Sequence, residues 1–151
     1  MIAAATATRL AGIHAAAFSA PWDAAAFEAL LDQTGVFVIE EPDGFILLRA
    51  VADEAEILTL AVRPEARRQG LGARLVRDGA TMAAGRGATR LFLEVADDNA
   101  AALALYARAG FAGAGRPVHR RPYFIIGRGR GVSLETRIDG SEPSTPRLHA
   151  P

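Results

Sequence analysis

Residues 56–76, EILTLAVRPEARRQGLGARLV, carry the most structural information in the chain. A β-rich run from Glu56 to Val62 leads through a glycine-containing turn into a helical pattern that starts at Gly70. At such a junction the free backbone N–H groups and the positive end of the helix can bind phosphate groups, and glycines let the backbone come close. The segment from Arg67 to Ala73 is therefore a candidate phosphate-binding loop, although a structural turn explains an isolated Gly-x-Gly equally well.

Two common nucleotide-binding motifs do not fit this segment. A P-loop requires Gly-Lys-Ser/Thr, whereas all 17 basic residues of the chain are arginines. The dinucleotide-binding motif requires three glycines at fixed spacing, of which only Gly70 and Gly72 are present. Both nucleotide-binding classes are therefore disfavoured.

The elements around this segment predict a mixed α/β fold. Asp23 can cap a helix, the turn from Glu41 to Gly44 is typical of a hairpin, and a strand, a helix and a second strand in succession indicate a parallel crossover. The predicted elements are a helix over 24–33, strands over 36–40, 45–52 and 56–62, a helix over 70–84, a strand over 90–95 and a helix over 99–109. We therefore expect a mixed, mostly antiparallel central sheet with a central parallel crossover, flanked by helices.

Length and composition predict one soluble domain. The chain has 151 residues, half of them apolar, which is enough to bury a core. We expect residues 1–138 to form the domain and residues 139–151, which are rich in Pro and Ser, to form a disordered tail. The absence of cysteine and the scattering of three histidines argue against a metal site. No apolar run has the ~20 residues of a membrane span and no secretory signal is visible, so the cytoplasm is the expected compartment.

The charges balance overall but cluster locally. An acidic cluster could favour a cationic substrate, or could simply be solvated loops. An arginine cluster lacks the interleaved aromatic residues of RNA-binding motifs, so direct binding to nucleic acid is not expected. The acidic cluster comprises Glu40, Glu41, Asp43, Asp53, Glu54 and Glu56, and the arginine cluster comprises Arg116, Arg120, Arg121, Arg128 and Arg130.

Two motifs in the same order resemble those of the GNAT acetyltransferases. Arg67-x-x-Gly70-x-Gly72 is similar to the pyrophosphate-binding signature of that family, and it follows a strand as it does there. Further along, the segment from Asn99 to Phe111, which contains Tyr106, resembles the second half of the family's cofactor site. The resemblance implies the GNAT fold and acetyl-CoA as co-substrate, with no metal.

Finer features resemble the RimI-type branch, which acetylates the N-terminal alanine of a small-subunit ribosomal protein. These are Phe18-Ser19-Ala20-Pro21-Trp22, the strand from Ala55 to Val62, and Leu93-Glu94-Val95. This resemblance implies a protein N-terminus as acceptor. An α-amine, with a reference pKa of about 8, also loses its proton more easily than a lysine at about 10.4.

The resemblance also implies roles for individual residues. Glu94 would be the general base and Tyr106 the general acid. Strand and helix periodicity allow both side chains to approach a shared site. The cofactor-binding residues would be Leu60, Ala61, Val62, Arg67, Arg68, Gln69, Gly70, Leu71, Gly72, Ala73, Asn99 and Tyr106. Asn99 could alternatively be only a helix cap, and Arg67 only a surface charge.

The acceptor side departs from the branch pattern. After Phe111 that branch continues with a basic residue and a Tyr-Tyr pair, whereas here Arg121-Pro122-Tyr123-Phe124 comes later and contains one tyrosine. Two alternatives therefore stay open: a GNAT enzyme that acts on another amine, and a non-catalytic acyl-CoA-binding module. The oligomeric state cannot be inferred from the sequence.

Overall fold

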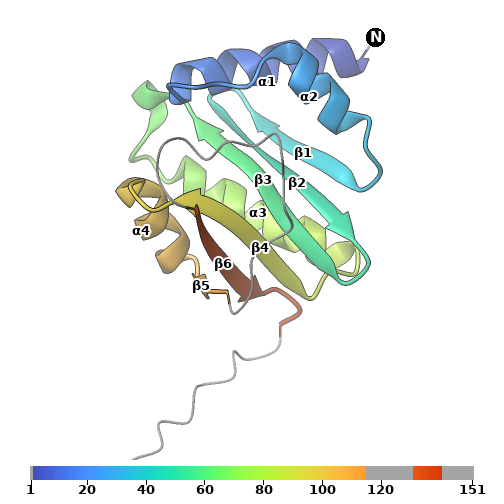
Figure 1. Cartoon of the computed structure of the whole chain (residues 1–151), viewed down its shortest axis with the longest axis vertical. Helices are drawn as coiled ribbons and strands as arrows, with labels where there is room; N and C mark the ends of the chain where they lie inside the picture. The colour runs from blue at the N-terminus through green and yellow to red at the C-terminus, as the bar shows by residue number, and fades with distance from the viewer. Residues whose placement is uncertain (1, 115–130, 141–151) are drawn as a thin grey trace, which may run out of the picture.

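The computed structural model describes residues 2–114 and 131–140. Their strands form one sheet in the order β1-β2-β3-β4-β6-β5, with β3 and β4 parallel and the other neighbours antiparallel (Figure 1). The predicted mixed sheet with a central parallel crossover is thereby confirmed. The elements are α1 (Ile2–Ala17), α2 (Ala24–Leu31), β1 (Val36–Glu41), β2 (Gly44–Val51), β3 (Glu54–Val62), the 3-10 turn η1 (Pro64–Ala66), α3 (Leu71–Gly85), β4 (Arg90–Ala96), α4 (Ala100–Arg108), β5 (Ala112–Gly113) and β6 (Gly131–Arg137).

The local signals for the hairpin and for α2 are confirmed. Glu41 pairs with Gly44, so Pro42 and Asp43 form the two-residue turn between β1 and β2. Asp23 caps α2 by accepting a hydrogen bond from the N–H of Ala26 at 2.9 Å. Both elements therefore follow from short-range chemistry in the sequence.

Helix α1 was not among the predicted elements. Its alanines favour a helix, but they occur all around it, so the apolar residues that face the core do not stand out from the rest of the sequence. The stripe nevertheless exists, because Ala7, Leu10, Ile13 and His14 are buried at helical spacing. Packing of this face against the sheet makes α1 part of the core.

Two apolar layers cover the two faces of the sheet. One core cluster contains α1 and α2 residues together with Phe45 and Leu47 of β2. The other contains α3 residues and Tyr106 together with Ile46 and Leu48, which alternate with the first pair along the same strand. In Figure 1, α3 lies behind the sheet. We call the two faces the α1/α2 face and the α3/α4 face.

Strands β3 and β4 separate halfway along their length. Their pairing runs from Glu54 with Arg90 to Ile57 with Leu93 and ends there, although both strands continue. At the same point β3 has a β-bulge, because Leu47 pairs with Thr59 while Leu48 pairs with Ile57, which leaves Leu58 as an extra residue. A bulge bends and twists its strand, so it explains why β3 leaves β4 here.

Several predictions concern segments outside the described residues. These are the arginine cluster between residues 116 and 130, the segment from Arg121 to Phe124, and residues 141–151 of the expected tail. Among the described helices, none is long and apolar enough to span a membrane. Within residues 2–114 and 131–140, no group of three His, Asp or Glu side chains could hold a metal ion.

Candidate functional site

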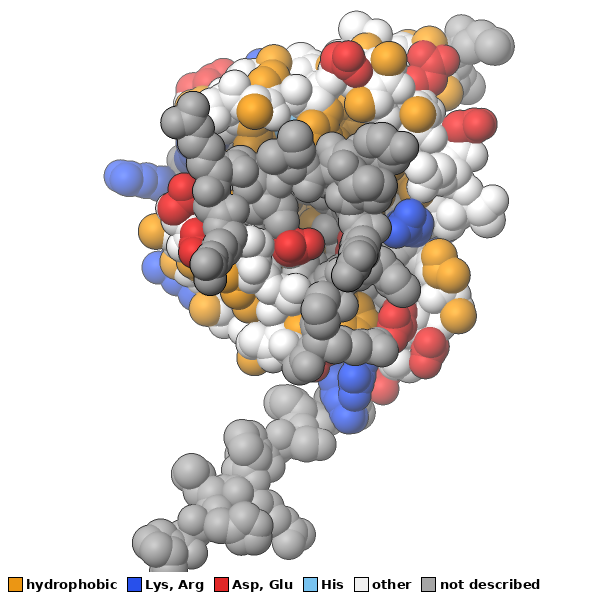
Figure 2. Space-filling model, viewed as in Figure 1, with side chains coloured by type: hydrophobic (Ala, Val, Ile, Leu, Met, Phe, Trp, Pro, Cys, Tyr) orange, Lys and Arg blue, Asp and Glu red, His pale blue; other side chains and the backbone are white. Residues whose placement is uncertain are grey.

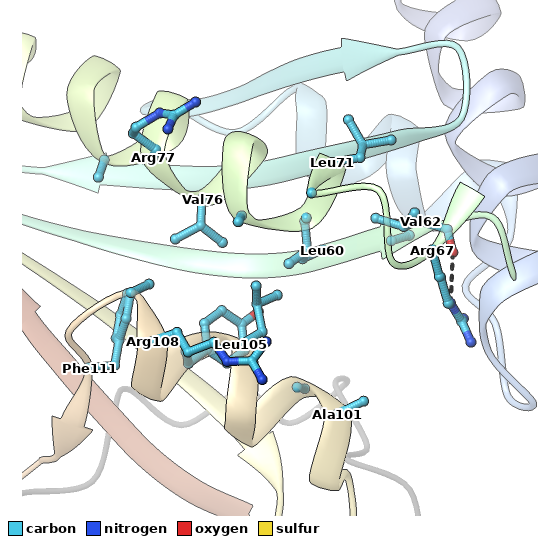
Figure 3. Close-up of a pocket in the computed structure, with 18 of the residues that line it drawn as sticks. Leu60, Val62, Arg67, Leu71, Val76, Arg77, Ala101, Leu105, Arg108 and Phe111 are labelled. Atoms are coloured by element: carbon cyan, nitrogen blue, oxygen red, sulfur yellow. Dashed lines mark hydrogen bonds between the residues drawn. The ribbon is translucent and has the colours of Figure 1, made fainter. Parts of the chain in front are cut away.

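A cavity of about 1190 Å³ lies between α3 and α4, beside the second half of β3. Figure 3 shows side chains from all three elements around it, including Leu60 of β3, Val76 of α3 and Leu105 of α4. Its volume exceeds the range typical of small-ligand pockets, so it can take a long ligand. The cavity is the candidate functional site.

One end of the cavity is the N-terminus of α3. Gly70 begins this helix in a left-handed conformation, with φ of 79° and without a side-chain cap. The first helical backbone bond runs from the N–H of Arg74 to the carbonyl of Gly70. Within the described residues, the N–H groups of Leu71, Gly72 and Ala73 therefore have no acceptor. Three free donors and the helix dipole make this end suitable for phosphate oxygens.

Gly72 lies where α3 packs closely against α4. A Cβ atom at this position would lie 3.3 Å from Cδ2 of Leu105. An added Cβ atom would require the Leu105 side chain of α4 to shift by a few tenths of an ångström. Glycine at position 70 thus permits the left-handed backbone conformation, whereas glycine at position 72 permits the close approach of α3 to Leu105 of α4.

The electrostatics of the cavity favour an anionic ligand. Among the described lining residues there is no carboxylate, while the arginines are Arg67, Arg68, Arg77, Arg108 and Arg137. The chain as a whole has a net charge of zero. On the face seen in Figure 2, acidic and basic side chains are interspersed. Positive charge is thus concentrated at the cavity, where it attracts phosphates.

Arg67 has a structural role in addition to its charge. Its guanidinium donates hydrogen bonds to the backbone carbonyls of Val62 and Ala17, each at 3.3 Å. The first carbonyl ends β3 and the second ends α1, so Arg67 ties these elements together beside the cavity. Arg67 is thus an exposed charge that also binds two backbone carbonyls, and its contact with a cofactor stays a prediction.

Asn99 is the N-cap of α4. Its side-chain oxygen accepts a hydrogen bond from the N–H of Ala102 at 3.2 Å. The same residue lines the cavity. The helix cap, one of the two interpretations of this residue, is therefore observed, and its contact with a cofactor stays a prediction.

Tyr106 lines the cavity from α4 and is 94% buried, with 6% of its surface exposed. Its ring packs edge-to-face on Phe111, with 5.4 Å between the ring centroids. Within the described residues its hydroxyl has no hydrogen-bond partner. Burial raises the pKa of Tyr106 above its ordinary value. The phenol is therefore protonated throughout the neutral range and has a proton to donate.

Glu94 lies elsewhere. It is exposed, it is the first β4 residue beyond the last β3–β4 pair, and it is not among the lining residues. Its neighbours Leu93 and Val95 belong to the same core cluster as Tyr106, so alternation places Glu94 on the α1/α2 face. Glu94 and Tyr106 therefore lie on opposite faces of the sheet, and their approach to a shared site stays a prediction. Chemistry involving both must pass through the opening between β3 and β4.

The other predicted binding residues gather at the cavity, with one exception. Gln69 is exposed and is not a lining residue, whereas all the remaining predicted cofactor-binding residues are. Their roles as cofactor ligands stay predictions.

Sequence reasoning missed the contribution of α1. Ala17 and Phe18, at and after the end of α1, also line the cavity. Behind Phe18 stands His14, which is buried within the apolar core. The helical spacing of Leu10, His14 and Ala17 could have indicated one buried face, but it gives no indication that this face reaches a functional site.

The fold and the site together define a class of protein. The sequence profile described as the acetyltransferase (GNAT) family matches residues 7–111, which is well over half of the chain. The chain belongs to this family.

Individual relatives within the family are named as acetyltransferases of particular acceptors. The chain is 41% identical over 86 residues to the [ribosomal protein bS18]-alanine N-acetyltransferase of Escherichia coli, covering 57% of this chain and 56% of the relative. It is 34% identical over 104 residues to a putative enzyme of the same name from Bacillus subtilis, covering 65% and 69%. A mycothiol acetyltransferase of Clavibacter michiganensis is 41% identical over 78 residues, which is 52% of this chain and 26% of the relative.

Solved structures agree with this assignment. The ribosomal-protein-S18-alanine N-acetyltransferase from Escherichia coli superposes with a TM-score of 0.74 and 28% identity, covering 93% of both chains. Arabidopsis thaliana NAA60 in complex with acetyl-CoA superposes with a TM-score of 0.70 and 19% identity, covering 90% of this chain and 95% of that one. The second likeness concerns the fold alone.

Proposed function

We propose that this protein transfers the acetyl group of acetyl-CoA to the N-terminal α-amine of a protein that begins with alanine, a small-subunit ribosomal protein. The observation that carries the proposal is that Tyr106, a buried residue whose hydroxyl has no partner among the described residues, lines the same cavity as the N-terminus of α3. A buried donor without a partner costs about 1–3 kcal/mol, so its retention favours a function. The relatives named as alanine N-acetyltransferases support the choice of acceptor.

The cavity suits acetyl-CoA along its length. The free N–H groups at the start of α3 and the lining arginines would hold the phosphates. Beyond Ile57, the side of β3 that faces away from β2 has no partner strand among the described residues. Backbone groups at Leu60 and Val62 would therefore bind the amides of the pantetheine arm, which leads the thioester to Tyr106.

The chemistry requires one base and one acid. The neutral amine attacks the thioester carbonyl, a C–N bond forms and the C–S bond breaks. Glu94, reached through the β3–β4 opening directly or through a water, would accept a proton from the amine. Tyr106 would donate its proton to the departing thiolate. An α-amine suits this site because it is more easily neutral than a lysine side chain near pH 7.

The second candidate is a GNAT enzyme that acts on another amine, and the mycothiol acetyltransferase relative favours it. A non-catalytic acyl-CoA-binding module is the third candidate. The Tyr106 hydroxyl, which has no partner in the part of the chain that the structure describes, argues against it, because binding alone does not require a buried proton donor.

A thiol-release assay tests the proposal directly. The chain has no cysteine, so a thiol reagent detects only the CoA released. We expect acetyl-CoA turnover with a hexapeptide that has a free N-terminal alanine, and not with spermidine or with an N-terminally acetylated peptide that contains one lysine. Preferred turnover of either control acceptor would sink the α-amine proposal, and binding without turnover of any acceptor would favour the binding module.

Tyr106→Phe tests the acid. Its kcat should fall about 100-fold or more, because general acid catalysis is lost, while the Kd for acetyl-CoA by calorimetry changes less than about threefold. Full activity in Tyr106→Phe would remove this residue from the mechanism.

Glu94→Gln tests the base against a matched control. We expect kcat/KM for the alanine peptide to fall about 100-fold. Glu135 of the neighbouring strand β6 lies near Arg90, with 4.0 Å between the charged groups. Glu135→Gln should leave the rate within about twofold, so equal losses in both variants would indicate a general charge effect.

A further inference from the structure

His14 is a polar residue in an apolar core. It lies on α1 and is only 2% exposed. Its ring stacks on Phe18, with 4.3 Å between centroids, and on Trp22, with 5.0 Å. A buried imidazole needs partners for both nitrogens to offset its desolvation, and it has both.

The two hydrogen bonds determine the state of the ring. The backbone N–H of Trp22 donates to Nδ1 at 3.0 Å, so Nδ1 carries no proton. The neutral ring then carries its proton on Nε2, which lies 3.2 Å from Oγ1 of Thr59 and donates to it. Replacement of His14 by an apolar residue therefore removes two specific hydrogen bonds, one with Trp22 and one with Thr59.

These bonds join three parts of the site. Thr59 follows the bulge residue Leu58, where β3 leaves β4. Phe18 starts the connection between α1 and α2, and Trp22 directly precedes Asp23, the N-cap of α2. Phe18 is 36% exposed and lines the cavity. It does so although α1 and α2 cover the α1/α2 face of the sheet, and the helices beside the cavity, α3 and α4, cover the opposite face. The cavity thus has a wall on the α1/α2 face, where Glu94 also lies.

A second tie holds the same connection. Arg67 donates to the carbonyl of Ala17, the residue before Phe18, and to that of Val62 on β3. The end of α1, which Phe18 follows, is therefore tied to β3 at two points. His14 binds Thr59, and Arg67 joins Ala17 to Val62. Such a wall is held in place before any acceptor arrives.

We infer that His14 is a positioning residue for acceptor recognition, holding the segment from Phe18 to Trp22 as the acceptor-side wall of the cavity. The inference rests on the proposed function. His14 touches neither acceptor nor acetyl-CoA, and acts through Phe18 and Trp22. It concerns the acceptor because the phosphate-binding end is formed by α3, whereas the hydrogen bonds and ring contacts of His14 within the described residues go to the α1/α2 layer, β2 and β3.

Steady-state kinetics with the alanine hexapeptide and acetyl-CoA varied separately test this inference. His14→Phe keeps an aromatic ring but loses both bonds, and should raise the KM for the peptide about tenfold while the KM for acetyl-CoA stays within about twofold. Thr59→Val, which loses one bond, should raise the peptide KM roughly threefold. His14→Asn keeps an acceptor near the Nδ1 position and should recover part of the loss.

Ile13→Val is the matched control. Ile13 precedes His14 and is buried in the same core cluster, but its side chain makes no hydrogen bond. Loss of a methylene there should lower stability without changing the peptide KM. A similar KM increase in Ile13→Val, or an equal increase of both KM values in His14→Phe, would overturn the assignment.

Trp22 provides a readout that does not depend on activity, because it is the only tryptophan of the chain. Acrylamide quenching of its fluorescence should increase about twofold in His14→Phe and stay unchanged in Ile13→Val. If the wild type acetylates no peptide, the proposed function fails, and quenching alone then decides whether His14 holds the segment. Unchanged quenching in His14→Phe would refute that role.

Discussion

Burial keeps His14 and Tyr106 neutral by the same physical effect with opposite signs. It lowers the pKa of His14 to about 4, because the charged imidazolium loses its hydration, and raises the pKa of Tyr106, because the phenolate does. For Tyr106 the neutral form is the proton donor of the proposed mechanism. For His14 it is the form that can accept from Trp22 and donate to Thr59.

The neutral state of His14 predicts a pH dependence of stability. The pKa of His14 is near 6.5 in the unfolded chain and about 4 in the folded chain, so between these pH values only the unfolded chain binds the proton. This contribution to the free energy of unfolding is therefore complete above about pH 6.5 and is lost as the pH falls towards 4. Between pH 7.5 and pH 5 the loss amounts to about 2 kcal/mol.

Urea unfolding of the wild type and His14→Phe at both pH values measures this effect. All other titrating groups cancel in the difference, so the wild type should lose about 2 kcal/mol more than the variant. Parallel pH dependences would mean that His14 is not buried in its neutral form.

At the scale of elements, α3 shows two glycines with different requirements. Gly70 at its start has φ of 79°, and a Cβ there would meet nothing within 4 Å, so only the backbone conformation demands glycine. Gly85 at its end is helical, and a Cβ there would also meet nothing within 4 Å. The same substitution should therefore have opposite effects at the two ends.

We expect Gly70→Ala to lower the free energy of unfolding by about 1 kcal/mol, because L-residues are strained at this φ. Gly85→Ala should raise it by about 0.5 kcal/mol through helix propensity. Urea denaturation of both variants is the measurement. A stabilising Gly70→Ala would show that the left-handed start of α3 is wrong.

At the scale of the whole molecule, the site joins both layers of the fold. The cavity takes residues from α1, β3, α3 and α4, which belong to the two core clusters. A ligand that fills it stabilises the folded state as a unit and has no site in the unfolded chain. Ligand binding should therefore raise the temperature of global unfolding.

Acetyl-CoA at 100 times its Kd should stabilise the protein by about 2.7 kcal/mol. For a chain of this size, that corresponds to an increase in Tm of roughly 5–11 °C in thermal unfolding. S-acetylpantetheine, which lacks the nucleotide phosphates, should at the same concentration give less than roughly a third of that shift, because the arginines and the α3 amides have nothing to bind. Equal shifts would contradict the phosphate-binding end.

Local chemistry in the sequence sufficed for most of the fold. The Asp23 cap, the Pro42-Asp43 turn and the helix from Gly70 depend on neighbours within a few residues, and each was predictable. The order of strand, helix and strand likewise predicted the parallel pair β3–β4. The cofactor-binding residues that the GNAT resemblance implied, apart from Gln69, line one cavity, and their roles as ligands stay predictions.

Only the tertiary structure decided how the site is completed. The bulge at Leu58 depends on a register with β2 that no local pattern encodes, and it opens β3 from β4. That opening leaves a route between Glu94 and the face of Tyr106, while long-range packing of α1 brings His14 to Thr59, 45 residues away. Short-range chemistry thus determined the elements and the motifs, whereas contacts between residues distant in sequence determined the walls of the cavity, because such contacts exist only once the layers pack together.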